Sequence, residues 1–223
     1  LNSYEDNIIT VEDPVELKIN GINQVQVNMK TGLTFVEGLR SILRQAPDII
    51  MIGEIRDSET AKIAIRASIT GHLVLSTIHT NDAVSTITRL VDMGVEPYLV
   101  SSSILGIISQ RLVRVLCSRC KTIRKATSEE QQLLNMPEGE LLLHYPVGCN
   151  ICNNTGYRGR RGVHEVVKID KKMREAISKG FSYDQLIDQG KKSGMVPLIQ
   201  NAKELVLQGI TTIDEVLNIS FFD

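Results

Sequence analysis

The chain has 223 residues, which is enough for one large domain or for a domain with a smaller companion. Hydrophobic residues make up 42%, charged residues 23%, and the formal net charge is -1, so the composition excludes a disordered or globally basic protein. No apolar stretch reaches the roughly 18 residues of a membrane span, and the amino terminus carries acids with no signal-peptide apolar region. We therefore expect a soluble, globular, cytoplasmic protein.

Short apolar runs alternate with helical patterns over residues 1–116, which predicts a parallel α/β unit. Strands are expected at residues 7–12, 25–28, 49–52 and 72–78. Helices are expected at residues 35–44 with Thr34 as the N-cap, 58–69 capped by Ser58, 82–93 capped by Asp82, and 97–110 after Pro97. The run 49–52 is wholly apolar and suits a central parallel strand that is covered on both faces.

The composition changes after residue 110, because residues 111–125 contain six basic residues, two cysteines and no acid. This predicts a separate small module that continues through a polar helix near residues 128–135 and a turn-rich segment at 148–162. From residue 170 the pattern is helical again, with helices expected near residues 170–178, 182–192, 197–208 and 211–218. We therefore predict three regions, 1–116, 117–162 and 163–223.

Charged residues gather where the predicted strands end. Glu54, Arg56 and Asp57 follow the strand at 49–52, Glu12 and Asp13 follow the first strand, and His79 follows the last one. Parallel strands of one sheet bring these ends to a common edge, where ligands bind in open α/β sheets. Nucleoside triphosphate hydrolysis needs a carboxylate for Mg²⁺, one for the attacking water and a donor to the γ-phosphate.

Each of these residues also has an ordinary structural explanation, since charged groups collect at strand ends anyway. Glu12 could be a surface acid, His79 a loop histidine with a satisfied ring, and Arg56 an ion-pair partner of Asp57. The joint occurrence of the three sites favours phosphate chemistry over these separate explanations.

All four cysteines fall into two C-x-x-C pairs, Cys117 with Cys120 and Cys149 with Cys152. Two such pairs separated by a few tens of residues suit a tetrahedral Zn²⁺ site with four thiolate ligands and no open position. Two disulfides, a redox pair and four incidental thiols are the alternatives, and a cytoplasmic protein makes disulfides the weaker one. The metal would stiffen the module and would not catalyse.

The basic run has two explanations, a solvated surface or a nucleic-acid contact of the kind some zinc ribbons make. No aromatic residue lies within the run 111–125, so base stacking on it is not expected. Gly156, Gly159 and Gly162 have the wrong spacing for a dinucleotide fingerprint, and a turn of the zinc module followed by a strand explains them better.

Three segments carry a resemblance to a known family. Residues 9–16, 39–57 and 70–82 resemble the aspartate box, the Walker B box and the histidine box of the ATPases that drive type II secretion and type IV pilus assembly. The four cysteines and the glycine turn also match, so the resemblance covers essentially the whole chain. The cysteine module is typical of assembly or secretion motors, whereas retraction motors lack it.

The resemblance implies an α/β fold, with a partial RecA-like P-loop ATPase core, an inserted tetracysteine zinc module and a helical carboxy-terminal region. By motif, Glu54 would act on Mg²⁺ or its water, Glu12 would position or activate the attacking water, and His79 would approach the γ-phosphate. Asp13 would lie in the same nucleotide and Mg²⁺ site, and Arg56 would sense nucleotide or relay charge between subunits. His72 is expected to support structure or a subunit contact, and either glutamate could be the general base.

The family further implies a hexameric, cytoplasmic motor on the inner face of the cytoplasmic membrane, with an inner-membrane platform protein as partner, ATP, Mg²⁺ and structural Zn²⁺ as cofactors, and no nucleic acid. No G-x-x-x-x-G-K-[ST] motif occurs in this sequence. We therefore expect a carboxy-terminal piece of a longer motor that, by itself, hydrolyses little or no ATP. A zinc-ribbon nucleic-acid-binding protein and a noncatalytic scaffold subunit are the alternative functions.

Overall fold

The computed structural model describes residues 1–2 and 5–220. The chain forms two compact units, each assembled from separate segments. The first comprises Leu1–Thr80, Val84–Ile107 and Lys168–Ser193, and the second comprises Asn81–Ala83, Ile108–Val167 and Gly194–Asp223. These two units are defined by compactness, whereas the three regions predicted from the sequence are defined by motifs. The division into three regions therefore stays a prediction.

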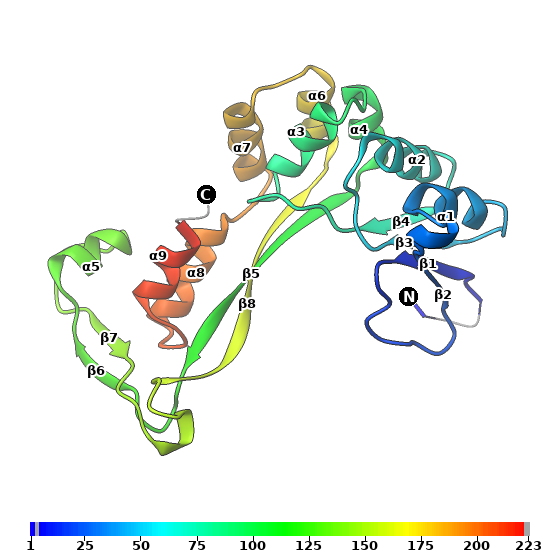
Figure 1. The fold of residues 1–223 in the computed structure, drawn as a ribbon. Coiled ribbons are helices and arrows are strands. Elements are labelled where there is room, and N and C mark those ends of the chain that lie inside the picture. Colours follow the sequence, from blue (N-terminus) through cyan, green and yellow to red (C-terminus); the bar gives the residue numbers. More distant parts are fainter. Residues whose placement is uncertain (3–4, 221–223) are drawn as a thin grey trace. The chain divides into compact units, whose positions relative to one another are not determined.

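The first unit is built on a four-stranded parallel sheet in the order β2-β1-β3-β4 (Figure 1). Its strands are β1 (Ile8–Glu12), β2 (Asn23–Gln26), β3 (Ile49–Ile52) and β4 (Leu73–Ser76). The two central strands, β1 and β3, are the most buried, and Val11 pairs with Ile52 near the carboxyl end of both. A parallel α/β sheet is therefore confirmed, and the predicted site residues follow its strands at one edge.

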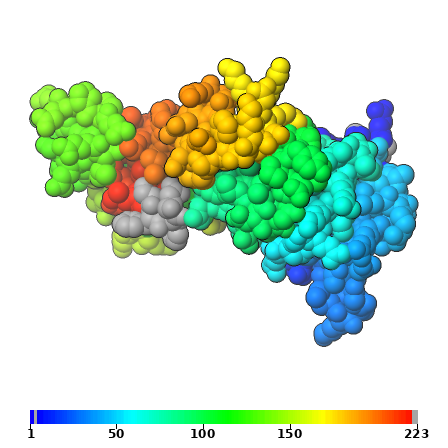
Figure 2. Space-filling model, turned by 90° about the horizontal axis from the view of Figure 1, so that it is seen from above, coloured from blue at the N-terminus to red at the C-terminus, as the bar shows by residue number. Residues whose placement is uncertain are grey.

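Helices cover the sheet or follow it in the first unit. They are η1 (Met29–Thr31), α1 (Phe35–Ile42), α2 (Ser58–Ile69), α3 (Ser85–Asp92), α4 (Pro97–Ser103), α6 (Lys171–Ser178) and α7 (Tyr183–Lys192). Helices α4 and α6 are about seventy residues apart in sequence but lie side by side (Figures 1 and 2). Nη1 of Arg174 fixes this pairing by donating to the carbonyl of Ser101 at 2.9 Å.

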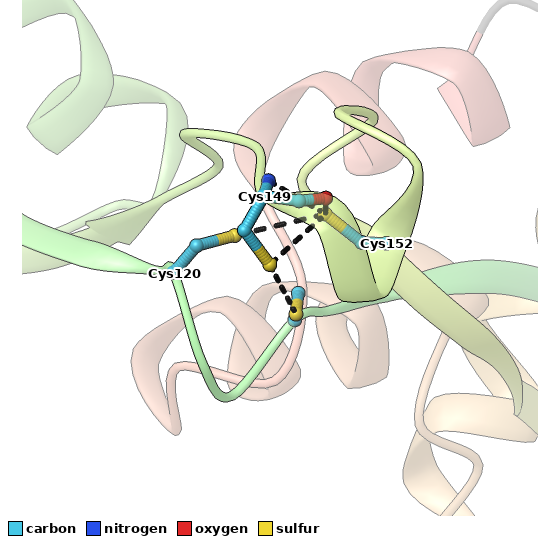
Figure 3. Close-up of side chains that lie close together, drawn as sticks. Cys120, Cys149 and Cys152 are labelled. Atoms are coloured by element: carbon cyan, nitrogen blue, oxygen red, sulfur yellow. Dashed lines mark hydrogen bonds between the residues drawn. The ribbon is translucent and has the colours of Figure 1, made fainter.

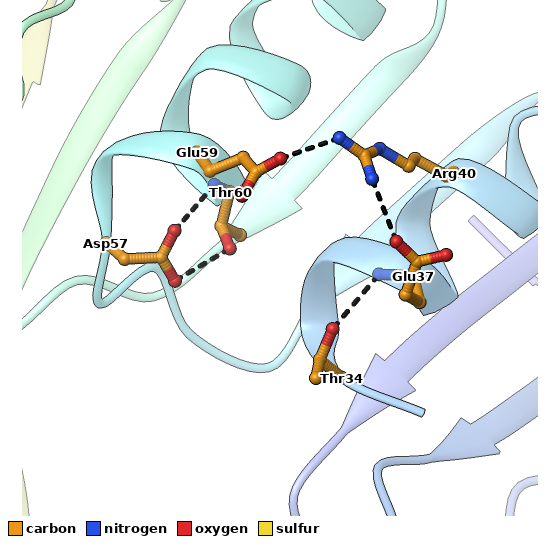
Figure 4. A network of polar contacts seen from close by, with 6 residues as sticks. All are labelled: Thr34, Glu37, Arg40, Asp57, Glu59 and Thr60. Carbon is orange, nitrogen blue, oxygen red and sulfur yellow. Dashed lines mark hydrogen bonds and ion pairs between the residues drawn. The ribbon is translucent and has the colours of Figure 1, made fainter. Parts of the chain in front are cut away.

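The loops that start α1 and α2 carry helix caps, and one arginine joins the two helices (Figure 4). Thr34 accepts the amide of Glu37, which confirms the predicted cap of α1. Asp57 caps α2 by accepting the amide and the hydroxyl of Thr60 at 2.8 and 2.9 Å. Arg40 contacts Glu37 at 2.8 Å and Glu59 at 2.6 Å, so α1 and α2 are tied together on their exposed side.

The second unit combines β-structure with two carboxy-terminal helices. Its elements are β5 (Gly106–Leu116), β6 (Thr122–Lys125), α5 (Ser128–Leu133), β7 (Leu142–Tyr145), η2 (Asn150–Cys152), β8 (Tyr157–Lys168), α8 (Leu198–Leu207) and α9 (Ile213–Ser220). The first two residues of β5 and the last residue of β8 belong to the first unit. Strands β5 and β8 form one two-stranded sheet, and the antiparallel pair β6–β7 forms another. Their core includes Val113, Leu143 and Val163 packed with Ala202 and Val206 of α8.

Three local predictions are wrong. The helix expected at 97–110 ends at Ser103, and the chain then enters β5, where exposed and covered residues alternate with the period of a strand. Ser58 is the first residue of α2, while Asp57 before it is the cap. Helix α3 begins at Ser85, and Val84 occupies the cap position, so the predicted start at Asp82 lies three residues too early.

Within the described part of the chain, no helix combines the length and the apolar character that crossing a membrane requires.

Candidate functional site

The predicted nucleotide-site residues lie at or just after the carboxyl ends of β1, β3 and β4. Backbone hydrogen bonds between these segments continue beyond the ends of the strands. Gly53 donates to the carbonyl of Val11 at 2.8 Å, and Ile55 donates to the carbonyl of Thr77 at 2.9 Å. A Cβ on Gly53 would lie 3.3 Å from Cα of Glu12, so a residue with little bulk is needed where these segments run together. The segments that carry Glu12, Glu54 and His79 therefore follow neighbouring strands at one edge.

Glu54 is the most enclosed acid of this edge, with 11% of its side chain exposed. Its Oε1 lies 2.6 Å from Nη2 of Arg56. Its Oε2 lies 3.3 Å from Nε2 of His79 but, among the described residues, accepts no hydrogen bond of good geometry. The hydrogen bond from Arg56 and the positive charges of Arg56 and His79 outweigh burial and lower the pKa of Glu54.

The structure brings Arg56 and His79 to Glu54 but leaves both side chains open to solvent. Arg56 is 66% exposed and His79 is 86% exposed. The hydrogen bond and charge of Glu54, with the charge of Asp13, raise the pKa of Arg56. Asp13 is therefore within electrostatic range of the arginine, whereas Asp57 serves as the cap of α2 and is not the ion-pair partner of Arg56.

Glu12 lies at the end of β1 and is held by its own strand and the next. The hydroxyl of Thr10 and Nε2 of Gln24 both donate to its Oε1, the second at 3.0 Å. In the part of the chain that the structure describes, Glu12 makes no hydrogen bond or ion pair with Glu54, Arg56 or His79. The structure thus places Glu12 on the same edge without direct contact.

His72 does not take part in this edge. Its Nδ1 lies 3.0 Å from the carbonyl of Ala67 and 3.3 Å from the hydroxyl of Thr70, at the end of α2. This position agrees with the structural part of the expectation for His72, since it satisfies a helix-terminal carbonyl.

The donor set at this edge suits Mg²⁺ or the water bound to it. Mg²⁺ in phosphate-transfer sites is held by one or two carboxylates and keeps several waters. The enclosed Oε2 of Glu54 makes no hydrogen bond of good geometry with any described residue, so it is available to such a water. The depressed pKa keeps this carboxylate ionised, as a ligand must be.

The four cysteines converge at one point of the second unit, where the loop after β5 meets the turn η2 (Figure 3). All four are free, and their sulfurs lie within 4.8 Å of one another. Three of the separations are 4.0 Å for Cys117–Cys149 and 3.8 Å for both Cys120–Cys152 and Cys149–Cys152. A tetrahedron with Zn–S bonds of about 2.3 Å has edges of about 3.8 Å, so the spacing fits zinc.

Backbone amides donate to the sulfurs of Cys120 and Cys152, and the pKa values of these two thiols differ. Burial opposes ionisation of Cys152, but the amides of Cys149 and Gly156 outweigh it and lower its pKa to about 6. Burial raises the pKa of Cys120 to about 11, against the opposing amide of Gly148. Amide donors to the sulfurs are the usual outer support of a thiolate metal site.

The basic run 111–125 is largely engaged within the second unit. Arg114 pairs with the buried Glu215 at 2.8 Å and stacks on Tyr157, and Arg124 pairs with Glu130 at 3.2 Å. The remaining contacts of the run are Arg111 with the carbonyl of Asn81, Lys121 with the carbonyl of Gly209, and Lys125 with Glu140. These contacts give five of the six basic residues of the run a partner within the chain.

One functional candidate escaped the sequence reasoning. Glu165 is 3% exposed, accepts the amide of Ala83 at 2.9 Å with Oε1, and accepts the amide of Leu198 at 3.2 Å with Oε2. Its partners lie 82 and 33 residues away, so no local pattern marks it. An acid within the apolar alternation of residues 163–167 was the available signal, since a charged residue at an inward strand position requires a buried partner.

The chain thus combines a parallel α/β sheet, whose carboxyl edge carries acidic residues, with a tetracysteine cluster. The chain matches the family described as "Type II/IV secretion system protein" over residues 1–218, and it belongs to that family. The predicted family is therefore confirmed.

Individual relatives are similar over nearly the whole chain. Type II secretion system protein E of Pseudomonas aeruginosa is 51% identical over 222 residues, covering 99% of this chain and 44% of that protein. Type IV pilus assembly ATPase PilB of Thermus thermophilus is 50% identical over 216 residues, covering 96% of this chain and 24% of that protein. The chain thus spans less than half the length of these curated relatives.

The fold is also found in solved structures. The pilus retraction motor PilT with bound ADP has a TM-score of 0.70 and 28% identity, covering 96% of this chain and 52% of that one. The ATPase DotB of Legionella pneumophila has a TM-score of 0.66 at 22% identity, which concerns the fold alone. Two of the relatives are named as ATPases, one of the type II secretion system of Vibrio cholerae and one of type IV pilus assembly in Thermus thermophilus.

Proposed function

We propose that this chain forms part of a motor ATPase that couples ATP hydrolysis to type II secretion or type IV pilus assembly. The observation that carries the proposal is the carboxylate of Glu54, enclosed at the sheet edge, with one oxygen held by Arg56 and the other directed at His79 without a hydrogen bond. Family membership supports the reaction class. ATP and Mg²⁺ are the cofactors that such a site requires.

The environment of Glu54 favours a ligand role over a general-base role. A general base works best with a pKa near the operating pH, whereas the pKa of Glu54 is lowered. Glu54 would therefore hold Mg²⁺ or its water, and bound Mg²⁺ would neutralise charge on the phosphates. Glu12, whose Oε1 takes both donors, keeps its second oxygen for orienting or deprotonating the attacking water.

The other predicted residues complete the site. His79, 3.3 Å from Glu54, would donate to the γ-phosphate from its exposed position. Arg56 and Asp13 would set the charge balance at the edge, and the exposure of Arg56 allows it to sense nucleotide or a neighbouring subunit. The roles proposed from the motifs are thus assigned to residues that follow the strands at one edge of the sheet.

The cysteine cluster would hold structural Zn²⁺ through Cys117, Cys120, Cys149 and Cys152. Four thiolates leave no open coordination position, so the ion would stabilise the second unit without taking part in hydrolysis. The sulfur separations of 3.8 to 4.0 Å and the surrounding amide donors support this proposal.

We further propose that the motor is a hexamer at the inner face of the cytoplasmic membrane, working with an inner-membrane platform protein and without nucleic acid. The relatives named for secretion and pilus assembly support this setting. Because this sequence contains no G-x-x-x-x-G-K-[ST] motif, the 223 residues by themselves should hydrolyse little or no ATP.

The test is ATP hydrolysis by the full encoded protein that contains this sequence, with Glu54→Gln as the variant and Glu59→Gln as its control. Glu59 is an exposed acid on α2 that pairs with Arg40, so its loss should change turnover less than about twofold. Glu54→Gln should lower kcat by about 100-fold or more. Turnover that persists in Glu54→Gln at the control level would overturn the proposal.

A further inference from the structure

Residues 77–80, the His79 segment, are fixed at their start by Thr77. The hydroxyl of Thr77 donates to the carbonyl of Gly53 at 2.6 Å, and the carbonyl of Thr77 accepts the amide of Ile55 at 2.9 Å. These two bonds join the segment to the residues on both sides of Glu54, whose Oε2 lies 3.3 Å from Nε2 of His79. The chain is therefore held in place two residues before His79.

A second contact holds the residue directly after His79. The hydroxyl of Thr80 lies 3.0 Å from the hydroxyl of Thr86, the second residue of α3. Thr86 is 7% exposed, and Ile87 and Leu90 of the same helix are buried as well. All of these residues belong to the first unit. A packed helix of that unit therefore supports the far end of the His79 segment.

Another threonine of α3 uses its hydroxyl in a different way. Thr88 donates to the carbonyl of Ser85 at 3.0 Å, which is a bond within the helix. The hydroxyl of Thr86 instead contacts Thr80, which lies outside the helix. A buried hydroxyl needs a hydrogen-bond partner, whereas an aliphatic side chain fills a buried helix position without that need. Contact with the His79 segment therefore explains a threonine at position 86 better than the packing of α3 does.

We propose that Thr86 is a positioning residue for His79. By holding Thr80, it keeps the imidazole opposite Oε2 of Glu54. The inference rests on the proposed function, because the place of His79 matters only if the sheet edge handles ATP. His79 lies in neither a helix nor a strand, and its side chain is 86% exposed, so its place depends on how the residues on either side of it are held. A misplacement of about 1 Å in an active site can lower a rate by about 100-fold.

A purely structural role for Thr86 predicts different results. Loss of a buried hydroxyl would then destabilise the first unit, and its effect on the turnover of the folded enzyme would not depend on His79. Thr88→Val is the matched control, since it removes a hydroxyl of the same residue type from the same helix. Thr86→Ser is the conservative variant, because serine loses the methyl group and keeps the hydroxyl.

The experiment is a double-mutant cycle on kcat for ATP hydrolysis in the full encoded protein, with Thr86→Val, His79→Ala and both together. Valine keeps the branched shape of threonine but has no hydroxyl. Thr86→Val alone should lower kcat about 10-fold, whereas Thr86→Ser and Thr88→Val should each change it by less than about twofold. In the His79→Ala background, Thr86→Val should change kcat by less than about twofold, because the residue it positions is gone.

Hydrogen exchange gives a readout that is independent of activity. Amides of residues 78–80 should exchange at least about threefold faster in Thr86→Val and at the original rate in Thr88→Val. Should Thr86→Val fail to fold, Thr80→Val replaces it in the cycle, since it removes the same hydrogen bond from a half-buried position.

Four results would each overturn the proposal. They are unchanged turnover in Thr86→Val, multiplicative losses in the cycle, a Thr86→Ser variant as impaired as Thr86→Val, and equal exchange in the two valine variants of α3.

The two proposals fail in different ways. If Glu54→Gln retains turnover in the same assay, the proposed function fails and the cycle has no reaction to report on. If Glu54→Gln is inactive while Thr86→Val and His79→Ala act multiplicatively, the ATPase site stands and only the positioning role is lost.

Discussion

Replacing Gly156 by alanine should destabilise the second unit much more than the same replacement at Gly159. The two glycines stand three residues apart around the start of β8, and both have left-handed backbone, with φ of +77° and +81°. They differ in their surroundings. A Cβ at Gly156 would lie 2.4 Å from Cβ and 3.0 Å from Cα of Pro146, whereas a Cβ at Gly159 would meet nothing within 4 Å.

The expected magnitudes follow from this difference. A left-handed alanine costs about 1–2 kcal/mol, and this cost is common to both variants. Overpacking against the half-buried Pro146 adds about 1–3 kcal/mol, and it applies to Gly156 alone because a proline ring and backbone cannot move aside easily. Gly159→Ala should therefore lose about 1–2 kcal/mol, and Gly156→Ala about 2–5 kcal/mol.

Urea unfolding of the purified chain, followed by circular dichroism, measures both variants. Gly156 also donates its amide to Cys152 Sγ at 3.3 Å and accepts the amide of Cys117 at 2.9 Å, so its variant should also bind zinc less completely. Equal losses at the two positions, or a larger loss at Gly159, would refute the view that these glycines build the cysteine turn.

Three further predictions concern the cap of α6, the packing of α1 and the metal. The hydrogen bond from the amide of Met173 is the main cause that lowers the pKa of Asp170, so this cap stabilises the fold at pH values above 3.8, the ordinary pKa of aspartate, and the stabilisation is lost as the pH falls below it. Asp170→Ala should lower the free energy of unfolding by about 1 kcal/mol at pH 7. Asp170→Asn should keep the cap and make the free energy of unfolding depend less on pH in the acid range. Gly38→Ala places a Cβ 2.9 Å from Cγ2 of buried Val11, so a gain of about 1 kcal/mol in helix propensity should be outweighed by about 1–3 kcal/mol of overpacking, giving a lower urea midpoint. Elemental analysis should find about one zinc per chain and less in Cys149→Ser, whereas zinc near zero in fresh protein would contradict a structural metal site.

Local signals predicted the first unit well. The apolar run of β3 and the neighbouring β1 are buried central strands, and Thr34 caps α1 as its position before an amphipathic helix indicates. The error at residues 104–110 has a physical cause. Ile107 and Ile108 are β-branched residues that suit a strand, but their spacing from Val100 and Ile104 also fits one face of a helix, and pairing with the distant β8 decides between the two.

Long-range contacts of the site could not be predicted. The motif places Glu54, Arg56 and His79 at one edge, but only the fold pairs Arg56 with Glu54 while Asp57 turns to its helix. The partners of Glu215 and Glu165 carry no local signal either, because they lie up to 101 residues away. Sequence patterns therefore predict which types of residue lie at the edge of the sheet. The hydrogen-bond and ion-pair partners of these residues depend on packing between segments that are far apart in the chain.

The segments that carry Glu12, Glu54 and His79 are held in different ways. Glu12 and Glu54 follow the central strands β1 and β3, whose Val11 and Ile52 are fully buried, so these carboxylates are fixed to the core of the first unit. His79 follows the edge strand β4, and the hydroxyl of the neighbouring Thr80 lies 3.0 Å from that of Thr86 on α3. Of the three site residues, His79 is therefore the one whose segment does not continue a central strand, so we expect its side chain to change place more readily than the two carboxylates.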